Sequence, residues 1–196
     1  MSLSSQLQSL VNKIGVSTNR PHLEAEIIQA ILDATAWYHS LGEFPLDSYE
    51  GLFVLSSGAT YEHTLDLGPL IPRLRSIREV AVYSQACART LYVMKQVKSL
   101  RPLNCDEARI TGTKVHVHSC RPQGCYKIVY YKHPDLAPAT FDSWIVRDYE
   151  GFVLDEALRR MYELLKDNSA AASYAARVGR PGIPGTHATV LIQNCS

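Results

Sequence analysis

The sequence predicts an α+β fold in which helices at the two ends of the chain enclose a block of strands. Apolar residues recur at helical spacing near both ends, whereas the central runs are short, β-branched or aromatic, and broken by turn residues. These patterns predict a helical bundle domain of residues 1–45 and 146–179. Residues 46–145 are expected to form an antiparallel β-sandwich or hairpin block, and residues 180–196 an extended C-terminal arm.

Two helices are expected at the N-terminal end. The first begins after Ser4 or Ser5, either of which can cap it, and Gly15 can end it. Its apolar stripe consists of Leu3, Leu7, Leu10, Val11 and Ile14. A stronger helix follows from about Pro21 to Leu41, because proline suits a first helical turn and the glycine after Leu41 can stop the helix.

The middle of the chain predicts strands joined by tight turns. The expected strands are residues 51–57, 60–67, 74–84 and 125–133. The first two of these runs are interpreted as a hairpin. Residues 89–97 fit a strand and a helix equally well. Thr-Gly-Thr at 111–113 lies between two alternating arms and predicts a compact hairpin turn.

A long helix is expected after the strands, with Asp148 as its cap. Its apolar stripe consists of Leu154, Leu158, Met161 and Leu165. Asp155–Arg159 and Glu156–Arg160 have the i,i+4 spacing of helical ion pairs, and both carboxylates are expected on a solvated face.

The helix can break or bend at KDNS (166–169), and an alanine-rich segment is expected to continue it as far as Gly179. Pro181 and Pro184 then exclude a helix in the segment that follows directly. The sequence HATVLIQ at 187–193 has the composition of a lone strand. The tail is therefore interpreted as an extended arm.

The stretch HVHSCRPQGC at 116–125 contains the ligand types that zinc prefers. On a strand, His116, His118 and Cys120 point to one face, and Cys125 can join them across the turn. The stretch lacks a second ligand pair at the spacing of a zinc finger. We therefore favour a hairpin in which the histidines are solvated and the neighbouring valines face the core, with no metal bound.

Net charge, apolar runs and cysteine content exclude some classes of protein. A net charge of +1 gives no reason to expect a chain that coats nucleic acid or a membrane. No run approaches the roughly 18 apolar residues of a membrane span. Five irregularly spaced cysteines and the lack of a signal peptide indicate reduced thiols and synthesis in the cytoplasm.

Sequence motifs for catalysis are missing. The chain has no glycine-rich phosphate loop, no Gly-x-Ser-x-Gly elbow and no His-Glu-x-x-His helix. The segment GRPGIPG at 179–185 is a linker, because it lacks the strand and helix that a phosphate loop needs. We therefore expect a protein that is not an enzyme and has no cofactor.

Four segments in a fixed order carry a resemblance. They are ATAWYHSLGEFP, LIPRLRSIREVAVYS, YKIVYYKHP and SWIVRDYEGFVLDEALRRMYELLKDNSAAASYAARV. In this order the chain resembles the head-to-tail adaptors, or connectors, of tailed bacteriophages, of the tail tubular protein A type. The resemblance covers about residues 5 to 178, and the tail from Arg180 has no counterpart in it.

The resemblance implies a structural protein of the virion. Copies of the chain, typically twelve, would form a ring beneath the portal protein at the phage neck, after synthesis in the host cytoplasm. The ring would extend the DNA channel and offer a surface to a tail nozzle or tube protein. Genomic DNA would pass through the lumen without sequence readout. The family provides no catalytic residues to carry over.

Two sets of residues are candidates for contacts in such a ring. The candidates for partner binding, by strand addition to a neighbouring sheet, are His187, Ala188, Thr189, Val190, Leu191 and Ile192. The alternative for this segment is a frayed terminus or a strand within its own domain. The candidates for the DNA channel are Arg159, Arg160 and Arg177, whose alternative role is pairing along their own helix.

Three other functions stay open at this point. Another ring component of the neck, such as a tail completion protein, would share the architecture and differ in its partner. A small zinc-dependent protein would use His116, His118, Cys120 and Cys125. An α+β domain of unrelated function is compatible with the same order of elements, because fold alone does not fix function.

Overall fold

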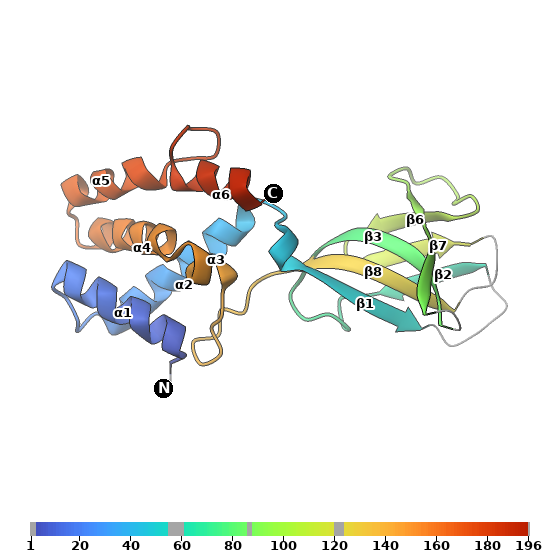
Figure 1. The fold of residues 1–196 in the computed structure, drawn as a ribbon, viewed down its shortest axis with the longest axis horizontal. Coiled ribbons are helices and arrows are strands. Elements are labelled where there is room, and N and C mark those ends of the chain that lie inside the picture. The colour runs from blue at the N-terminus through green and yellow to red at the C-terminus, as the bar shows by residue number, and fades with distance from the viewer. Residues whose placement is uncertain (1–2, 55–60, 86–87, 120–123, 196) are drawn as a thin grey trace. The chain divides into compact units, whose positions relative to one another are not determined.

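The computed structural model describes residues 3–54, 61–85, 88–119 and 124–195. Within these residues the chain is α+β, as predicted (Figure 1). It divides into two compact units, one formed by Met1–Leu46 together with Pro134–Ser196 and the other by Asp47–His133. The first, the helical unit, is therefore built from both ends of the chain. The second, the β unit, is inserted between them.

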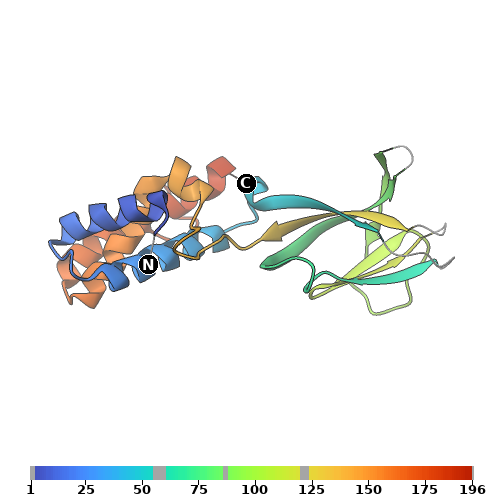
Figure 2. The same cartoon turned by 90° about the horizontal axis from the view of Figure 1, so that it is seen from below.

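The helical unit has six helices among its described residues. They are α1 (Ser5–Thr18), α2 (Glu24–Ser40), α3 (Trp144–Asp148), α4 (Glu150–Leu164), α5 (Asn168–Val178) and α6 (His187–Cys195). Helix α2 packs against α1 and α4, and α4 packs against α5 (Figures 1 and 2). The fully buried side chains of its core include Leu7, Leu10, Ile14, Ile27, Ile31, Tyr38, Ile145, Val153 and Leu191.

Two helix ends differ from the sequence prediction. Ser4 caps α1 as expected, because its Oγ accepts a hydrogen bond of 3.3 Å from the backbone N–H of Leu7. The helix continues past Gly15 and ends where Asn19 adopts a left-handed conformation, with φ of 53°, and donates its backbone N–H to Val16. Asp148 does not cap α4, since it is the last residue of the short helix α3.

The segment that joins the β unit to α3 belongs to the helical unit, although the sequence analysis placed residues 134–145 in the β-rich domain. The backbone N–H of Ser4 donates to the carbonyl of Pro138 over 2.9 Å. Gln6 makes two hydrogen bonds, of 3.2 and 3.1 Å, with the backbone of Ser143. The hydroxyl of Ser143 also lies 3.0 Å from Nε2 of His39 on α2.

The C-terminal segment is a helix, and the prediction of an extended arm with a strand at 187–193 is wrong. Prolines and glycines are confined to the loop ahead of α6, so they do not interrupt it. Ala188 and Leu191 are three residues apart, lie on one helical face and are fully buried. Burial of this face, rather than the β-branched composition of the segment, decides its structure.

The β unit contains eight strands in two sheets among the described residues. They are β1 (Ser48–Val54), β2 (Glu62–Asp66), β3 (Leu74–Ser84), β4 (Arg89–Val93), β5 (Lys95–Gln96), β6 (Glu107–Thr111), β7 (Lys114–His118) and β8 (Cys125–Lys132). One sheet has the order β1-β8-β3-β4 and is antiparallel, and the other has the order β2-β7-β6-β5, with β5 parallel to β6. The core of the unit takes side chains from both sheets.

Several strand predictions are confirmed and one is wrong. Strands β3 and β8 match the expected segments. Strands β6 and β7 form the expected hairpin, and Gly112 has the positive φ of 59° that its turn requires. The first two strands do not form a hairpin, because β1 pairs with β8 and β2 pairs with β7 in the other sheet. The ambiguous segment at 89–97 forms β4 and β5.

Candidate functional site

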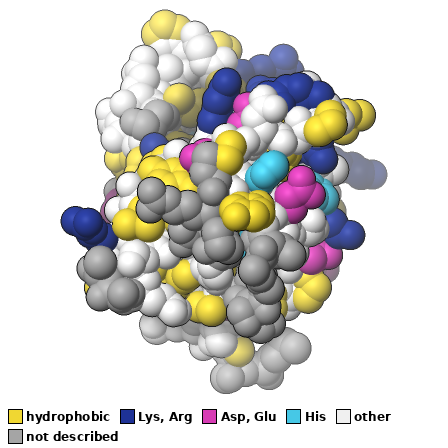
Figure 3. Space-filling model, turned by 90° about the vertical axis from the view of Figure 1, so that its right-hand side faces the viewer, with side chains coloured by type: hydrophobic (Ala, Val, Ile, Leu, Met, Phe, Trp, Pro, Cys, Tyr) yellow, Lys and Arg dark blue, Asp and Glu magenta, His cyan; other side chains and the backbone are white. Residues whose placement is uncertain are grey.

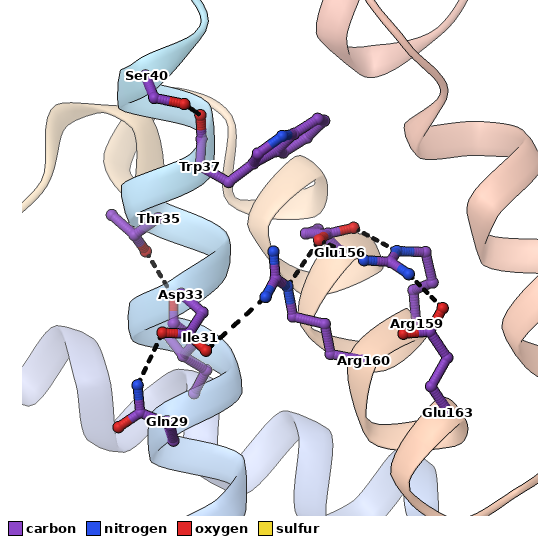
Figure 4. A network of polar contacts seen from close by, with 10 residues as sticks. All are labelled: Gln29, Ile31, Asp33, Thr35, Trp37, Ser40, Glu156, Arg159, Arg160 and Glu163. Atoms are coloured by element: carbon purple, nitrogen blue, oxygen red, sulfur yellow. Dashed lines mark hydrogen bonds and ion pairs between the residues drawn. The ribbon is translucent and has the colours of Figure 1, made fainter.

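A buried carboxylate on α4 organises the largest group of charges in the helical unit. Glu156 is 2% exposed, and its two oxygens accept hydrogen bonds of 2.6 and 2.8 Å from Nε and Nη2 of Arg159. Nε of Arg160 donates to the same carboxylate over 2.6 Å. One carboxylate therefore holds two guanidinium groups, and it lies between them in Figure 4.

Two further carboxylates complete this group, which we call the Glu156 network. Nη1 of Arg159 donates to Glu163 one helical turn further along α4. Nη1 of Arg160 lies 3.7 Å from Oδ2 of Asp33 and so links α4 to α2. The bond to Glu156 raises the pKa of Arg159 above its ordinary value, which keeps this guanidinium charged. Two cations and three carboxylates leave no net positive charge in the network.

A hollow of about 670 Å³ lies beside the Glu156 network. Its polar wall is formed by Glu156, Arg159 and Arg160, and Trp37 of α2 closes another side. The loop between α5 and α6 contributes an apolar rim together with the exposed Arg180. The residues that line this loop side are Val178, Gly179, Arg180, Pro181 and Ile183.

The two arginines supply this hollow with hydrogen-bond donors and not with a base. Arginine remains protonated in proteins, so it does not act as a base at neutral pH. The nearby Tyr38 is fully buried, and burial raises the pKa of its hydroxyl above the ordinary value, with the charge of Glu156 a lesser cause. Its protonated phenol is no nucleophile. The network holds α2 and α4 together and orients two guanidinium groups.

A second charged group joins α4, α5 and α6. Asp155, whose side chain is 15% exposed, lies 3.3 Å from Nη1 of Arg177 and 3.8 Å from Nε2 of His187. The imidazole of His187 stacks on Phe152, with ring centroids 4.1 Å apart. Its Nδ1 is buried and has no hydrogen-bond partner among the described residues. Helix α6 is therefore attached to the unit by a ring stack and a shared carboxylate.

This second group makes the stability of the helical unit depend on pH. Burial lowers the pKa of His187 below its ordinary value of 6.5, although the Asp155 carboxylate acts in the opposite direction. The folded protein then binds fewer protons at His187 than the unfolded chain does. The contribution of His187 to stability is complete above about pH 6.5 and is lost as the pH falls through the folded-state pKa.

We expect His187→Phe to weaken this pH dependence. Phenylalanine keeps the ring stack on Phe152 but does not titrate, so the variant should lose less stability than the native protein between pH 7.5 and pH 5. Urea unfolding of both proteins at the two pH values measures the difference. The other histidines are common to the two proteins. Equal losses of stability would contradict the assignment.

The structure divides the five charged residues that the sequence singled out on α4 and α5 between two groups. The predicted pair Glu156–Arg160 is present. Asp155 does not pair with Arg159, because it turns to Arg177 and His187, while Arg159 turns to Glu156 and Glu163. The prediction of solvated carboxylates is wrong for both acids. The two neighbours in sequence therefore belong to two different charged groups.

His116 and His118 lie on β7, the second strand of the predicted β6–β7 hairpin, and residues 120–123 of the His/Cys stretch lie outside the described residues. Val115 and Val117 are buried in the core of the β unit, and the two histidines lie on the other face of β7. Nδ1 of His116 lies 3.0 Å from the hydroxyl of Thr64, and Nδ1 of His118 lies 3.0 Å from the carbonyl of Leu103. Both imidazoles therefore have protein partners of their own.

The cysteines do not complete a set of metal ligands among the described residues. Cys120 lies outside the described residues, as does Cys87. Cys125 and Cys195 are free thiols, and burial raises the pKa of the Cys125 thiol, which makes it a poor nucleophile. Cys105 is disulfide-bonded, whereas the sequence analysis expected reduced thiols. Within the described part of the chain, no group of three or more His, Cys, Asp or Glu side chains is placed to hold a metal ion.

The sequence singles out Arg159 and Arg160, but it does not predict the other residues that line the hollow with them. Trp37 and Arg180, which also line the hollow, were not among the candidate site residues. A signal for the buried Glu156 does exist, because it lies between Val153 and Ala157 on the face that faces the core.

No protein-family model matches the chain, and no curated protein is similar to it. None of the helices in the described residues is long and apolar enough to cross a membrane.

Proposed function

We propose that the chain is a structural protein of a phage virion, a head-to-tail adaptor that forms a ring under the portal protein. The observation that carries this proposal is the arrangement of the chain. Both ends form one helical unit, and a β unit is inserted between them. Together with the adaptor-like order of the four sequence segments, this arrangement provides two separate bodies, one for each of two docking partners.

The finer architecture that we infer is a helical bundle joined to a β-sandwich whose strands are antiparallel except for the pair β5–β6. The side-by-side packing of α1, α2, α4 and α5 supports the bundle. The sandwich is supported by a core that includes Leu65 and Val117 of one sheet and Val80 and Ile128 of the other. Rigid bodies of this kind suit a ring, because each copy must hold its two interfaces at a fixed geometry.

Apolar side chains are exposed on both units. Among the described residues, Val16 of the helical unit is 82% exposed and Leu100 of the β unit is 88% exposed. The face drawn in Figure 3 has hydrophobic side chains lying between charged ones. Single exposed apolar residues are common on monomers, whereas clusters of them mark interaction surfaces.

The proposed ring does not need the three arginines as DNA ligands. Arg159 and Arg160 are neutralised within the Glu156 network, and Arg177 lies 3.3 Å from Asp155 and over the ring of Tyr174. Phosphates gain little from guanidinium groups that already share carboxylates. DNA passing through the lumen would therefore meet a surface of little net charge at these positions.

The C-terminal segment is a helix, so we propose a different mode of partner binding for it from the strand addition that its sequence suggests. Strand addition by residues 187–192 is not proposed, since Ala188 and Leu191 are buried in the helical core. Docking through the outward face of α6 fits the structure better. The portal protein and a tail nozzle or tube protein are the partners that we propose for the ring.

Particle imaging of the purified protein, alone and mixed with a candidate portal protein, tests the proposal. We expect rings, typically of twelve copies, that form only or more completely with the portal. The matched control is the portal mixed with an unrelated protein of similar size. A chain that stays monomeric and ignores the portal would contradict the proposal, and rings that dock only on a tail tube would indicate a tail completion protein instead.

A further inference from the structure

The net charge of +1 conceals an uneven distribution of charge between the two units. Residues 47–133, the β unit, contain twelve lysines and arginines and seven aspartates and glutamates. The helical unit contains eight lysines and arginines and twelve aspartates and glutamates. The formal charges are therefore +5 for the β unit and −4 for the helical unit. An anionic partner would be attracted to the β unit.

Four cations of the β unit lie together at the β5–β6 margin of the sheet β2-β7-β6-β5, and we call them the basic edge. They are Lys95, Lys98, Arg101 and Arg109. The backbone N–H groups of Lys95 and Val97 donate to the carbonyls of residues 106 and 108, at 3.0 and 2.9 Å. Nη1 of Arg109 donates to the carbonyl of Arg101 over 3.0 Å. These bonds hold the segment that carries the first three cations against the strand that carries the fourth.

A buried carboxylate anchors two members of the basic edge. Glu107 is 4% exposed and accepts a hydrogen bond of 2.7 Å from Nη2 of Arg101. Nζ of Lys95 lies 3.9 Å from the same carboxylate. The bond to Arg101 lowers the pKa of Glu107 to about 2, so this carboxylate is charged at neutral pH. It carries one negative charge between two cations.

The other two members of the basic edge do not share their charge. Lys98 is exposed, and neither Lys98 nor Arg109 pairs with a carboxylate among the described residues. With Asp106 counted beside Glu107, two carboxylates accompany four cations at this margin. The basic edge therefore has a surplus of positive charge, whereas the network around Glu156 has none.

Polar side chains lie beside Arg109 on the outer face of the sheet. The strand register places Arg109, His116 and Thr64 in a row across three strands, and all three line a hollow of about 420 Å³. Nε and Nη2 of Arg109 donate to no described residue. Guanidinium and hydroxyl groups are common ligands of nucleic-acid phosphates. The basic surface ends at β2, where the exposed residues Glu62 and Asp66 are acidic.

We propose that the basic edge contacts the phosphate groups of DNA. The inference rests on the proposed function, because it gives the DNA in the lumen of the ring a contact surface on the β unit. A DNA backbone carries one negative charge on each phosphate, so several cations on one short margin can each meet one. Contacts of this kind position a protein on DNA but do not read its sequence.

Binding of the full-length chain to a short fluorescent DNA duplex tests the proposal. Fluorescence anisotropy measures the affinity between about 50 and 200 mM salt. We expect binding that is the same for duplexes of different base sequence and that weakens as salt is added. If each of the four cations meets one phosphate, the slope of log K against log salt should be roughly −3 to −4.

Neutralising two lysines of the basic edge should weaken this binding. Lys95→Gln combined with Lys98→Gln keeps the bond between the guanidinium of Arg101 and its buried carboxylate. At about 50 mM salt we expect a loss of affinity of about tenfold or more, and a slope that is shallower by roughly two. The matched control is Arg20→Gln with Lys166→Gln, which removes two exposed charges from the helical unit. Circular dichroism shows whether both variants are folded.

Three results would overturn the proposal. The first is a variant of Lys95 and Lys98 that binds DNA like the native protein. The second is an equal loss in the control variant, because the total charge of the chain would then explain the binding. The third concerns competitors: polyglutamate that binds as tightly as DNA would indicate an acidic protein partner. Inorganic phosphate that displaces DNA better than chloride at equal ionic strength would likewise indicate a site for free phosphate at the hollow beside Arg109.

The binding experiment and the imaging experiment fail independently of each other. Rings that form with the portal protein, from a chain that binds no DNA, would overturn this inference and leave the adaptor function standing. A chain that never forms rings but binds DNA through Lys95 and Lys98 would support the basic edge as a DNA contact and contradict the adaptor.

Discussion

Glu156→Gln is expected to lower the free energy of unfolding by about 3 kcal/mol, at the lower end of the range for breaking a buried ion pair. Glutamine preserves the shape of the side chain but removes its charge. The guanidinium groups of Arg159 and Arg160 then lose the carboxylate that both share, and their side chains are only 22% and 31% exposed. Water replaces part of that interaction, which is why the lower end of the range applies. Urea unfolding monitored by circular dichroism measures the loss.

Glu163→Gln is the matched control for this experiment. Glu163 also binds Arg159, but its side chain is 53% exposed. Ion pairs at the surface contribute less than about 1 kcal/mol, so this variant should unfold near the native midpoint. A Glu156→Gln variant no less stable than Glu163→Gln would mean that water reaches the Glu156 carboxylate in solution.

The elements that the sequence predicted well are those whose structure depends on a local pattern of residues. The strands at 74–84 and 125–133 are long runs rich in β-branched and aromatic residues, and Gly112 has the positive φ that its hairpin turn needs. Pairing of strands is different. Because β1 and β2 follow each other in sequence, they were expected to form a hairpin, and no local pattern shows that their partners are β8 and β7.

The sequence predicts several residues of the candidate site but not which of them pair with one another. An i,i+4 rule predicts that Glu156 and Arg160 are neighbours, which they are. The same rule paired Asp155 with Arg159, but it cannot see that α5 and α6 bring Arg177 and His187 to Asp155 from other parts of the chain. The burial of Glu156 and the partial burial of Asp155 accord with these pairings, since carboxylates are seldom buried unless paired. Local spacing therefore identifies the participants but does not assign their partners.

The same limit explains the error at the C-terminus, where composition and packing disagree. Residues 187–193 are rich in residues that favour strands, yet α6 places Ala188 and Leu191 on one face against the helical core. A strand would instead bury alternate residues, such as Ala188, Val190 and Ile192. The two structures therefore predict different patterns of sensitivity to mutation along the same short segment.

Leu191→Ala should lower the free energy of unfolding by about 3 kcal/mol, because it removes a fully buried side chain and leaves a cavity in the helical core. Urea unfolding measures the total loss, and amide hydrogen exchange shows whether α6 opens before the rest of the unit. Gln193→Ala, at an exposed position of the same helix, should change stability by less than about 0.5 kcal/mol. If Val190→Ala and Ile192→Ala were both more damaging than Leu191→Ala, the segment would be a strand in solution. Sensitivity confined to Leu191 would mean that the C-terminal segment is folded before any partner arrives, so that a docking partner meets a helix held in place and not a free arm.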